Sequence, residues 1–297
     1  MTFLSIVILS YNTKDLTLSC LQSLIEQYRK ELKSGTVEII VVDNASTDGS
    51  VESIKYYVLS SKYKDVRLRV IENDENLGFA KGCNIGAKKS KGKYILFLNS
   101  DTQVLDKGFL KMIGFLDSNQ KVGILGGRLL NPDNSPQPSA GKFYNLFNLF
   151  LMLIGSERFG LLRKSPKNIE RVDWVSGACL MIGKSVFDQL KGFDENFFMY
   201  IEDMELCFRA NKLGFLTYFY PDIKIIHKEL GSSNRSFAII HIYKGLLYFY
   251  SKHKGYFQYI IAKVMLEVKA KVGIVVGFLI GNSSLKKTYI EAIKFKI

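Results

Sequence analysis

The sequence has few of the residues that build metal clusters, with four cysteines and three histidines among 297 residues. No two cysteines form a Cys-x-x-Cys pair, and each lies among apolar or small residues, so we expect free, buried thiols and no zinc site. The cysteines are Cys20, Cys83, Cys179 and Cys207. No apolar run reaches the roughly 18 to 20 residues that a membrane-spanning helix requires. The first residues carry no basic leader or cleavage site, so we expect a mature, cytoplasmic protein.

Negative charge is scarce relative to positive charge, because 28 aspartates and glutamates face 41 lysines and arginines, which leaves a net charge of +13. Nucleic acid, anionic lipid and phosphorylated substrates are the partners that such an excess favours. Much of it is C-terminal, since seven lysines and two glutamates follow residue 254. The chain has no RNA-binding or helix-turn-helix signature, so we expect no nucleic-acid partner.

Apolar, β-branched runs alternate with amphipathic stretches through the first half of the chain. The runs cover residues 3–9, 37–42, 66–71 and 94–98. This alternation predicts an α/β fold, with a mainly parallel central sheet flanked by helices. We expect Asn12 or Thr13 to cap the first helix, and the second to begin at Ser46 or Thr47.

Polar clusters follow three of the predicted strands, at residues 10–12, 43–46 and 99–101. Because ligands collect at the carboxyl ends of strands in open α/β sheets, we expect these clusters to converge. Carboxylate and amide oxygens at Asn99 and Asp101 suit a magnesium or manganese ion beside a diphosphate. The carboxylate of Asp43 could accept hydrogen bonds from a base or ribose, or it could only cap the following helix.

A glycine-rich segment at residues 76–86 lies between the third and fourth predicted strands. It matches neither the G-x-G-x-x-G fingerprint nor a P-loop, which disfavours dehydrogenases and NTPases. Its glycines permit close backbone approach, and Lys81 could lie against a diphosphate. Packing between helices explains the same glycines equally well.

The second half contains one dense stretch of aromatic and acidic residues, ending in Glu202 and Asp203 at the start of a predicted helix. Acids in a first helical turn are favoured by the helix dipole alone. With Phe197, Phe198 and Tyr200 just before them, they also suit a lined pocket that holds a general base. A lone histidine such as His227 is usually structural.

Six segments, in this order, resemble the inverting glycosyltransferases of family 2. They are SIVILSYN, EIIVVDNASTDGS, ENLGFAKGCNIG, YILFLNSD, WVSGACLMI and FFMYIEDMELCFRA. The resemblance covers about residues 3 to 235 and is greatest to the bacterial rhamnosyltransferase-like branch, which builds cell-surface polysaccharides. It implies the GT-A fold of nucleotide-diphospho-sugar transferases.

The resemblance also implies roles for individual residues. The nucleotide base and ribose would be held by Ser10, Tyr11 and Asp43, and the donor diphosphate would lie beside Asn76 and Lys81. The catalytic base would be Asp203. The acceptor region would contain Trp174, Gly177 and Glu202.

A divalent cation, manganese or magnesium, is the implied cofactor. Its ligands would be Asp101, as the second acid of the family's DxD motif, together with His227 and Asn99. The first acid of that motif is replaced here by Asn99, whose amide oxygen can coordinate but carries no charge. Most of the electrostatic binding of the metal therefore falls to Asp101.

The implied reaction is a single displacement in which Asp203 deprotonates an acceptor hydroxyl, which attacks the anomeric carbon of a nucleoside-diphosphate sugar. The expected donor is dTDP-rhamnose, with UDP-hexoses and galactofuranose donors as alternatives. The expected acceptor is a glycan on a polyprenyl diphosphate. The rival hypothesis is a noncatalytic nucleotide-sugar-binding protein whose site has degenerated.

We expect a GT-A domain over residues 1–235, with a nucleotide-sugar half (1–130) and an acceptor half (131–235). A basic, aromatic, helical extension would cover 236–297. Residues 143–162 and 255–297 are either core helices or amphipathic elements on the inner face of the cell membrane. The second option would make the protein peripheral to that membrane; the oligomeric state stays open.

Overall fold

The computed structural model describes residues 2–59, 65–156, 160–228 and 234–294. Its strands are β1 (Leu4–Ser10), β2 (Val37–Asp43), β3 (Leu68–Glu72), β4 (Tyr94–Asn99), β5 (Thr102–Val104), β6 (Val122–Leu130), β7 (Pro136–Gln137), β8 (Ala140–Gly141), β9 (Arg163–Lys164), β10 (Glu170–Val172), β11 (Trp174–Val175), β12 (Cys179–Gly183) and β13 (Leu216–His227). Its helices are α1 (Lys14–Ser34), α2 (Ser50–Leu59), α3 (Gly78–Lys89), α4 (Gly108–Ser118), α5 (Leu146–Leu153), α6 (Lys184–Gln189), α7 (Glu202–Lys212), α8 (Arg235–His253), α9 (Tyr256–Leu279) and α10 (Ser283–Ala292).

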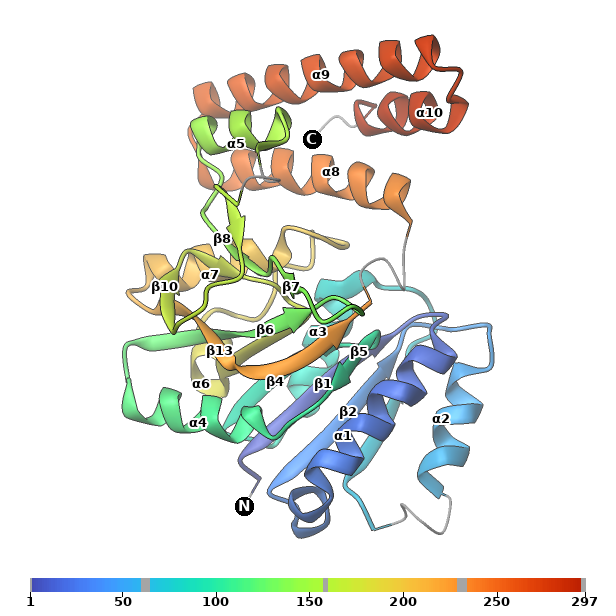
Figure 1. The fold of residues 1–297 in the computed structure, drawn as a ribbon, viewed down its shortest axis with the longest axis vertical. Helices are drawn as coiled ribbons and strands as arrows, with labels where there is room; N and C mark the ends of the chain where they lie inside the picture. Colours follow the sequence, from blue (N-terminus) through green and yellow to red (C-terminus); the bar gives the residue numbers. More distant parts are fainter. Residues whose placement is uncertain (1, 60–64, 157–159, 229–233, 295–297) are drawn as a thin grey trace.

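A ten-stranded sheet has the order β10-β13-β6-β12-β4-β1-β2-β3, with β5 on β13 and β7 on β6 (Figure 1). Strand β1 pairs in parallel with β2 and β4, and β2 pairs in parallel with β3. The predicted parallel sheet of the first half is therefore confirmed. Strand β12 runs antiparallel between β4 and β6, which makes the whole sheet mixed. A separate small sheet has the order β11-β8-β9.

Hydrophobic side chains cover both faces of the sheet, because successive residues of a strand point to opposite sides. Along β1, Ile6 and Ile8 belong to the core cluster under α1, whereas Val7 belongs to the cluster under α3. Strand β2 is buried at every position, as expected of a parallel strand covered on both faces. This arrangement fixes the carboxyl ends of β1, β2 and β4 along one edge.

The predicted start of the second helix is wrong, since α2 begins at Ser50. The preceding residues form a tight turn, with positive φ angles at Ala45 (59°) and Gly49 (80°). Asp43 accepts hydrogen bonds from the backbone N–H and hydroxyl of Ser46, at 2.8 and 2.6 Å. Asp48 accepts from the backbone N–H and hydroxyl of Ser50, so the helix begins three or four residues later than expected.

Thr13 occupies the cap position of α1, as predicted, but its side chain makes no capping hydrogen bond. Its hydroxyl instead lies 3.1 Å from the hydroxyl of Thr17. The four cysteines are free and buried, and burial raises the pKa of Cys20, Cys179 and Cys207 to about 12. The prediction of buried thiols is therefore confirmed.

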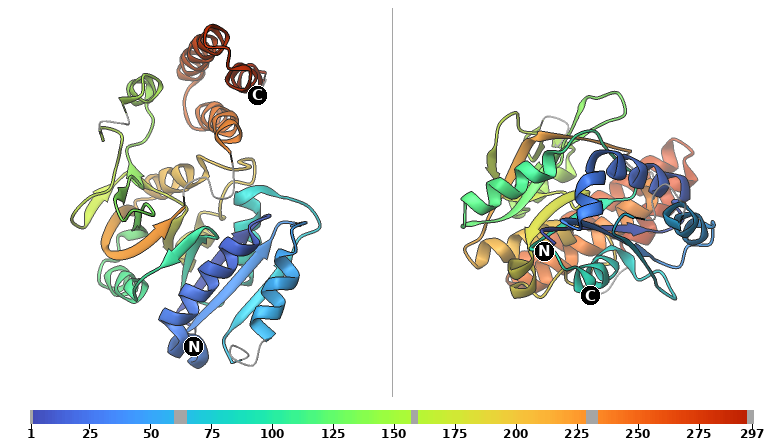
Figure 2. Two further views of the ribbon diagram at one scale, coloured as in Figure 1. Left: turned by 45° about the vertical axis from the view of Figure 1, so that its right-hand side comes forward. Right: turned by 90° about the horizontal axis from the view of Figure 1, so that it is seen from below.

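The last three helices form a layer with α5 at the end of the molecule farthest from α1 and α2 (Figures 1 and 2). Helix α9 packs against α5, α8 and α10, and α8 lies between α9 and the ten-stranded sheet. The hydroxyl of Tyr250 on α8 donates to the carbonyl of Tyr144, 3.0 Å away. In the part of the chain that the structure describes, no helix combines the length and apolar character needed to cross a bilayer.

Candidate active site

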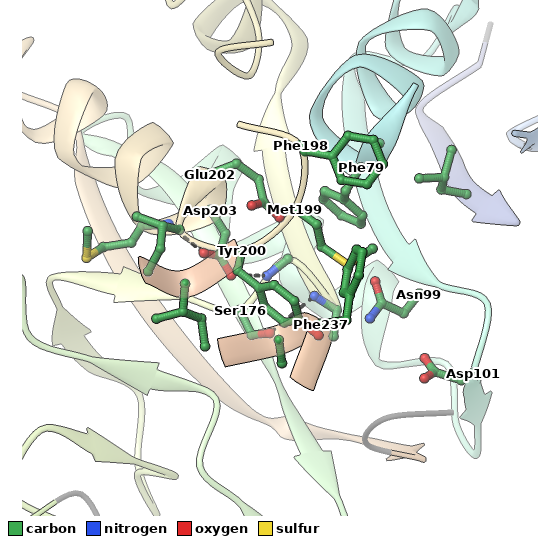
Figure 3. A pocket seen from close by; sticks show the side chains of 18 of the residues that line it. Phe79, Asn99, Asp101, Ser176, Phe198, Met199, Tyr200, Glu202, Asp203 and Phe237 are labelled. Atoms are coloured by element: carbon green, nitrogen blue, oxygen red, sulfur yellow. Dashed lines mark hydrogen bonds between the residues drawn. The ribbon is translucent and has the colours of Figure 1, made fainter. Parts of the chain in front are cut away.

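A cavity of about 490 Å³ lies between the carboxyl edge of the sheet and helix α8 (Figure 3). Most of the predicted site residues line it, namely Tyr11, Asn76, Asn99, Asp101, Trp174, Gly177, Glu202, Asp203 and His227. Asn99 and Asp101 lie on one side of the cavity, and Glu202 and Asp203 lie on the other (Figure 3). Residues far apart in sequence thus line the same cavity.

Three predicted donor-binding residues do not line this cavity: Ser10, Asp43 and Lys81. Ser10 is fully buried, and its hydroxyl lies 3.3 and 3.1 Å from those of Thr13 and Thr17. Asp43 accepts from Ser46 in the turn before α2; because α2 begins at Ser50, Asp43 does not cap that helix, as the alternative had it. Roles for these residues in donor binding remain predictions.

The glycine-rich segment opens α3, and its glycines serve close packing within the protein. A Cβ atom on Gly78 would lie 2.4 Å from the carbonyl oxygen of Phe198, and one on Gly82 would lie 2.3 Å from the side chain of Leu9. The backbone N–H of Phe79 donates to the same Phe198 oxygen, at 2.6 Å. Helix α3 therefore supports the loop in front of α7.

Asn99, Asp101 and His227 meet where β4 ends and β13 ends; we call this group the donor corner. The Nε2 atom of His227 lies 3.3 Å from Oδ1 of Asp101 and 3.3 Å from the Asn99 amide nitrogen. Asp101 is buried, and this Oδ1 atom makes no hydrogen bond. The approach of the two atoms therefore has no hydrogen-bond geometry.

Gln137, on β7, orients the histidine of the donor corner. Its Oε1 atom lies 2.7 Å from Nδ1 of His227, and Gln137 is buried. Because a glutamine oxygen can only accept, Nδ1 carries the proton, and the Nε2 lone pair faces Asp101. Nothing in the sequence pattern singled out Gln137, which lies 90 residues from His227.

The donor corner fits a divalent cation. It offers an unpartnered buried carboxylate oxygen, an unprotonated imidazole nitrogen and an amide that can present its oxygen after rotation. Within the described ranges, no group of three or more histidine, cysteine, aspartate or glutamate side chains could hold a metal. The third protein ligand would therefore be the neutral Asn99.

Glu202 and Asp203 open helix α7 on the other side of the cavity; we call this pair the base corner. Asp203 accepts hydrogen bonds from the backbone N–H groups of Gly177 (2.9 Å) and Met204 (2.7 Å). Glu202 is buried, and its Oε2 atom makes no hydrogen bond. Glycine at position 177 lets the backbone approach, because a Cβ atom there would lie 3.3 Å from Phe79 and 3.6 Å from Asp203.

Burial raises the pKa of both carboxyl groups in the base corner. For Asp203, the two backbone N–H groups and the charge of Arg163 oppose this rise only in part. For Glu202, the negative charge of Asp203 adds to the effect of burial, so its pKa lies well above the usual range. Of the two groups, Glu202 has its protonated form favoured more strongly, and Asp203 is the one that ionises more readily.

The chain is strained just before the base corner. Tyr200 and Ile201 have φ angles of 68° and 71°, in the left-handed region that β-branched residues avoid. Helix α8 packs directly on them, because a Cβ atom on Gly245 would lie 2.9 Å from Cγ1 of Ile201 and 3.1 Å from the carbonyl oxygen of Tyr200. Such strain persists where the surrounding structure holds it.

A buried ion-pair network also connects α8 to α7. Glu205 on α7 is fully buried and accepts hydrogen bonds from Arg209 (2.8 Å), Lys252 (2.9 Å) and His253 (2.8 Å). Lys252 also donates a hydrogen bond to Asp194, 2.6 Å away. No sequence pattern predicted this network; its signals in the sequence are the acidic residue in the first turn of α7 and the Lys-His pair at the end of α8.

Arg163, on β9, was also missed as a site residue. Among the described residues that line the cavity, it is the only lysine or arginine. Its guanidinium carbon lies 5.5 Å from the ring centre of Trp174, whose indole N–H donates to the carbonyl of Lys142. Lys81, the predicted cation, lies elsewhere, so Arg163 provides the positive charge of this cavity apart from histidine.

Comparison with known proteins identifies the same family as the sequence motifs do. The profile of glycosyl transferase family 2 matches residues 5–190. The N-acetylglucosaminyl-diphospho-decaprenol L-rhamnosyltransferase of Mycobacterium tuberculosis (strain ATCC 25618 / H37Rv) is 25% identical over 245 residues, which is 75% of this chain and 77% of the relative. The dTDP-rhamnosyl transferase RfbF of Shigella flexneri is 27% identical over 229 residues, covering 74% and 67%.

Solved structures show the same fold at lower identity. The mannosyltransferase PcManGT of Pyrobaculum calidifontis, in complex with GDP-Man and Mn²⁺, matches with a TM-score of 0.59 at 15% identity, over 98% of this chain and 84% of that one. Residues 1–349 of S. aureus TarS match with a TM-score of 0.55 at 15% identity, covering 99% and 90%. The fold is GT-A, and the chain belongs to glycosyl transferase family 2, the enzymes that transfer a sugar from a nucleotide-sugar donor.

Proposed function

We propose that this glycosyltransferase moves rhamnose from dTDP-rhamnose to a hydroxyl of a lipid-linked glycan, with inversion at the anomeric carbon. The observation that carries the proposal is the single cavity that contains both the donor corner and the base corner. Rhamnose is favoured because two of the compared relatives bear the names of rhamnosyltransferases. UDP-hexoses and galactofuranose donors remain the alternatives to be tested.

In this proposal Asp203 is the catalytic base. It takes the proton of the acceptor hydroxyl while the new C–O bond forms, and the bond from the anomeric carbon to the nucleoside diphosphate breaks on the opposite face. Burial of Asp203 raises its pKa and hence its strength as a base. Protonated Glu202 beside it limits the negative charge close to the incoming hydroxyl.

The donor corner would hold the diphosphate side of the donor. Asp101, His227 and Asn99 would be the protein ligands of a manganese or magnesium ion, which when bound supplies positive charge for the leaving diphosphate. Gln137 keeps the imidazole Nε2 atom directed at that position. The compared PcManGT structure contains Mn²⁺, in line with this assignment.

The acceptor side of the cavity combines Arg163 and Trp174 with apolar residues of α5 and α8, including Met152, Phe237 and Ile242. A cation beside an apolar wall suits an acceptor that has both a diphosphate and a lipid chain. The M. tuberculosis relative is named for a decaprenol-diphosphate acceptor, which supports this class.

The test is a transfer assay with dTDP-rhamnose, UDP-glucose and UDP-galactofuranose as donors and polyprenyl-diphospho-N-acetylglucosamine as acceptor, with and without manganese. Asp203→Asn should lower transfer by about 10³-fold or more while donor affinity stays unchanged, whereas Glu202→Gln, the matched control, should lose far less. Near-normal transfer by Asp203→Asn would refute the assignment of the base. Donor binding without any transfer would favour the noncatalytic alternative.

The pH dependence provides a second test. Since the pKa of Asp203 is raised and the base must be ionised, transfer should increase with pH through a midpoint above the ordinary aspartate range. A midpoint near pH 4, measured on kcat/KM, would contradict the role of the buried carboxylate.

A further inference from the structure

Helix α9 is apolar on the face directed away from the rest of the molecule. This outer face carries six apolar residues spaced three, four or seven positions apart: Phe257, Val264, Val268, Val272, Val275 and Leu279. Their exposed fractions are 76%, 52%, 54%, 52%, 55% and 74%. At about 1.5 Å per residue the row extends over roughly 33 Å, the length of a small domain.

The opposite face of α9 already holds the helix in place. Ala262, Leu266, Ala270, Gly273 and Gly277 are buried there, against α5, α8 and α10. The outer face is therefore not needed for packing within the chain. A helix that is apolar on both sides normally lies in a protein core or against lipid. Valine is also not favoured in an exposed helix by its propensity, so we expect another surface to cover the outer face.

Basic residues flank this outer face. By helical spacing, Lys271 lies within the outer face, three positions after Val268 and four before Val275, whereas Lys263, Lys269 and the single acid Glu267 lie between the outer and inner faces of α9. At the same end of the molecule α10 adds Lys286 and Lys287, both exposed. Pairing with a second copy of this chain would bring lysines of one copy beside those of the other, whereas anionic headgroups would neutralise them.

We propose that the outer face of α9 lies on an anionic phospholipid bilayer, with its valines in the headgroup boundary and the flanking lysines at the phosphates. Helices of this kind lie in the plane of the interface, which agrees with the finding that no described helix can cross a bilayer. Helix α8 lies directly beneath α9 and lines the active-site cavity. Docking would thus hold the cavity two helix layers, α9 and α8, or roughly 20 Å, from the membrane.

Neighbouring helix α5 supports the same assignment. It packs against α9 and has its own exposed row at helical spacing, with Phe147, Phe150 and Ile154 exposed by 67%, 51% and 61%. Apolar exposure of this extent on two adjacent helices is larger than the scattered residues of an ordinary surface. The predicted segments 143–162 and 255–297 thus contain this surface, although their residues 157–159 and 295–297 lie outside the described ranges.

Flotation of the full chain with vesicles tests the proposal. The wild type should bind vesicles of phosphatidylglycerol and phosphatidylcholine at low salt, bind pure phosphatidylcholine weakly, and dissociate in part at high salt. Val268→Asp combined with Val272→Asp should reduce the partition coefficient about tenfold or more. Tyr56→Asp, on exposed α2 at the other end, is the matched control and should bind as the wild type does.

The proposal would be overturned if the double variant bound vesicles as the wild type does, or if the wild type bound neutral and anionic vesicles equally. It would also be overturned if the wild type formed a dimer that the double variant disperses, and did not bind vesicles. If the double variant does not fold, a fluorescent label on the outer face tests the proposal instead. Because the native cysteines are buried, a thiol introduced by Val272→Cys can be modified selectively with an environment-sensitive dye. Its emission should shift to the blue with anionic vesicles, whereas the same dye at Tyr56→Cys should not respond.

Discussion

The donor corner and the base corner of the cavity are held in place by different parts of the chain. Asn99 and Asp101 follow strand β4, and His227 ends β13, so the sheet itself positions them. Glu202 and Asp203 instead follow a strained loop that packs on Gly245 of α8, and their helix is bound to α8 through Glu205. The C-terminal helices therefore support the cavity on one side only.

The largest effects should come from substitutions in the two corners, one of which should weaken donor binding and the other only sugar transfer. Asp101→Ala removes the one carboxylate of the donor corner, so donor affinity in the presence of manganese should fall by about 10²-fold or more, and transfer with it. Asp203→Asn should abolish transfer without changing donor affinity. Calorimetry of donor binding on both variants checks the contrast. Equal loss of donor affinity in the two variants would show that the corners do not act separately.

Disrupting the link between α7 and α8 should affect stability and the base corner together. Glu205→Gln leaves Arg209, Lys252 and His253 without their buried carboxylate, so the free energy of unfolding should fall by about 3 kcal/mol in urea denaturation at pH 7. Donor affinity of the remaining folded protein should be unchanged, because the donor corner rests on the sheet. A loss below about 0.5 kcal/mol would contradict a structural role for the network.

The same network predicts an acid dependence. Burial alone would raise the pKa of Glu205, but the hydrogen bond from His253, the charge of Arg209 and the hydrogen bond from Lys252 together lower it below the usual value. A carboxyl group with a depressed folded pKa stabilises the protein above its unfolded pKa and loses that contribution as the pH falls through the folded pKa. The stability difference between wild type and Glu205→Gln should therefore shrink below about pH 4.5.

A smaller effect should come from the contact between α8 and the strained loop. In Gly245→Ala the new methyl group would lie 2.9 Å from Ile201, so the loop must shift and kcat should fall by roughly tenfold with little change in donor affinity. Gly114→Ala is the matched control, because it is also helical and a Cβ atom there meets nothing within 4 Å. That control should be neutral or slightly stabilising. An equal kcat in both variants would show that the contact between Gly245 and the strained loop does not act on the base corner.

The smallest effect should be that of Gln137. Gln137→Ala removes the acceptor that fixes the His227 tautomer, so the affinity for manganese should fall about tenfold while the fold is retained. The thermal shift produced by manganese without donor is the measurement. An unchanged shift in this variant would show that Gln137 does not act on the metal position.

Local patterns predicted those parts of the site that follow directly from strand ends. Apolar alternation identified the parallel strands, and the position of Asp101 just after a buried run placed it at their carboxyl edge. The start of α2 was misplaced because Asp43 and Asp48 form successive turns that a capping pattern does not distinguish from a helix start. Gly78 and Gly82 were ambiguous in sequence, and their neighbours Phe198 and Leu9 explain them by packing.

The sequence by itself determined the family, the order of the strands' polar ends and the pair Glu202–Asp203, because these are carried by contiguous residues. Only the tertiary structure decided which of them share a cavity, that Gln137 and Arg163 belong to the site, and that α8 holds the base corner. Those facts depend on groups 26 to 90 residues apart in the chain meeting after it folds, and no local propensity encodes such a meeting. The exposure of one face of α9 was likewise undecided in sequence, since an apolar helix has the same pattern in a core as at a membrane.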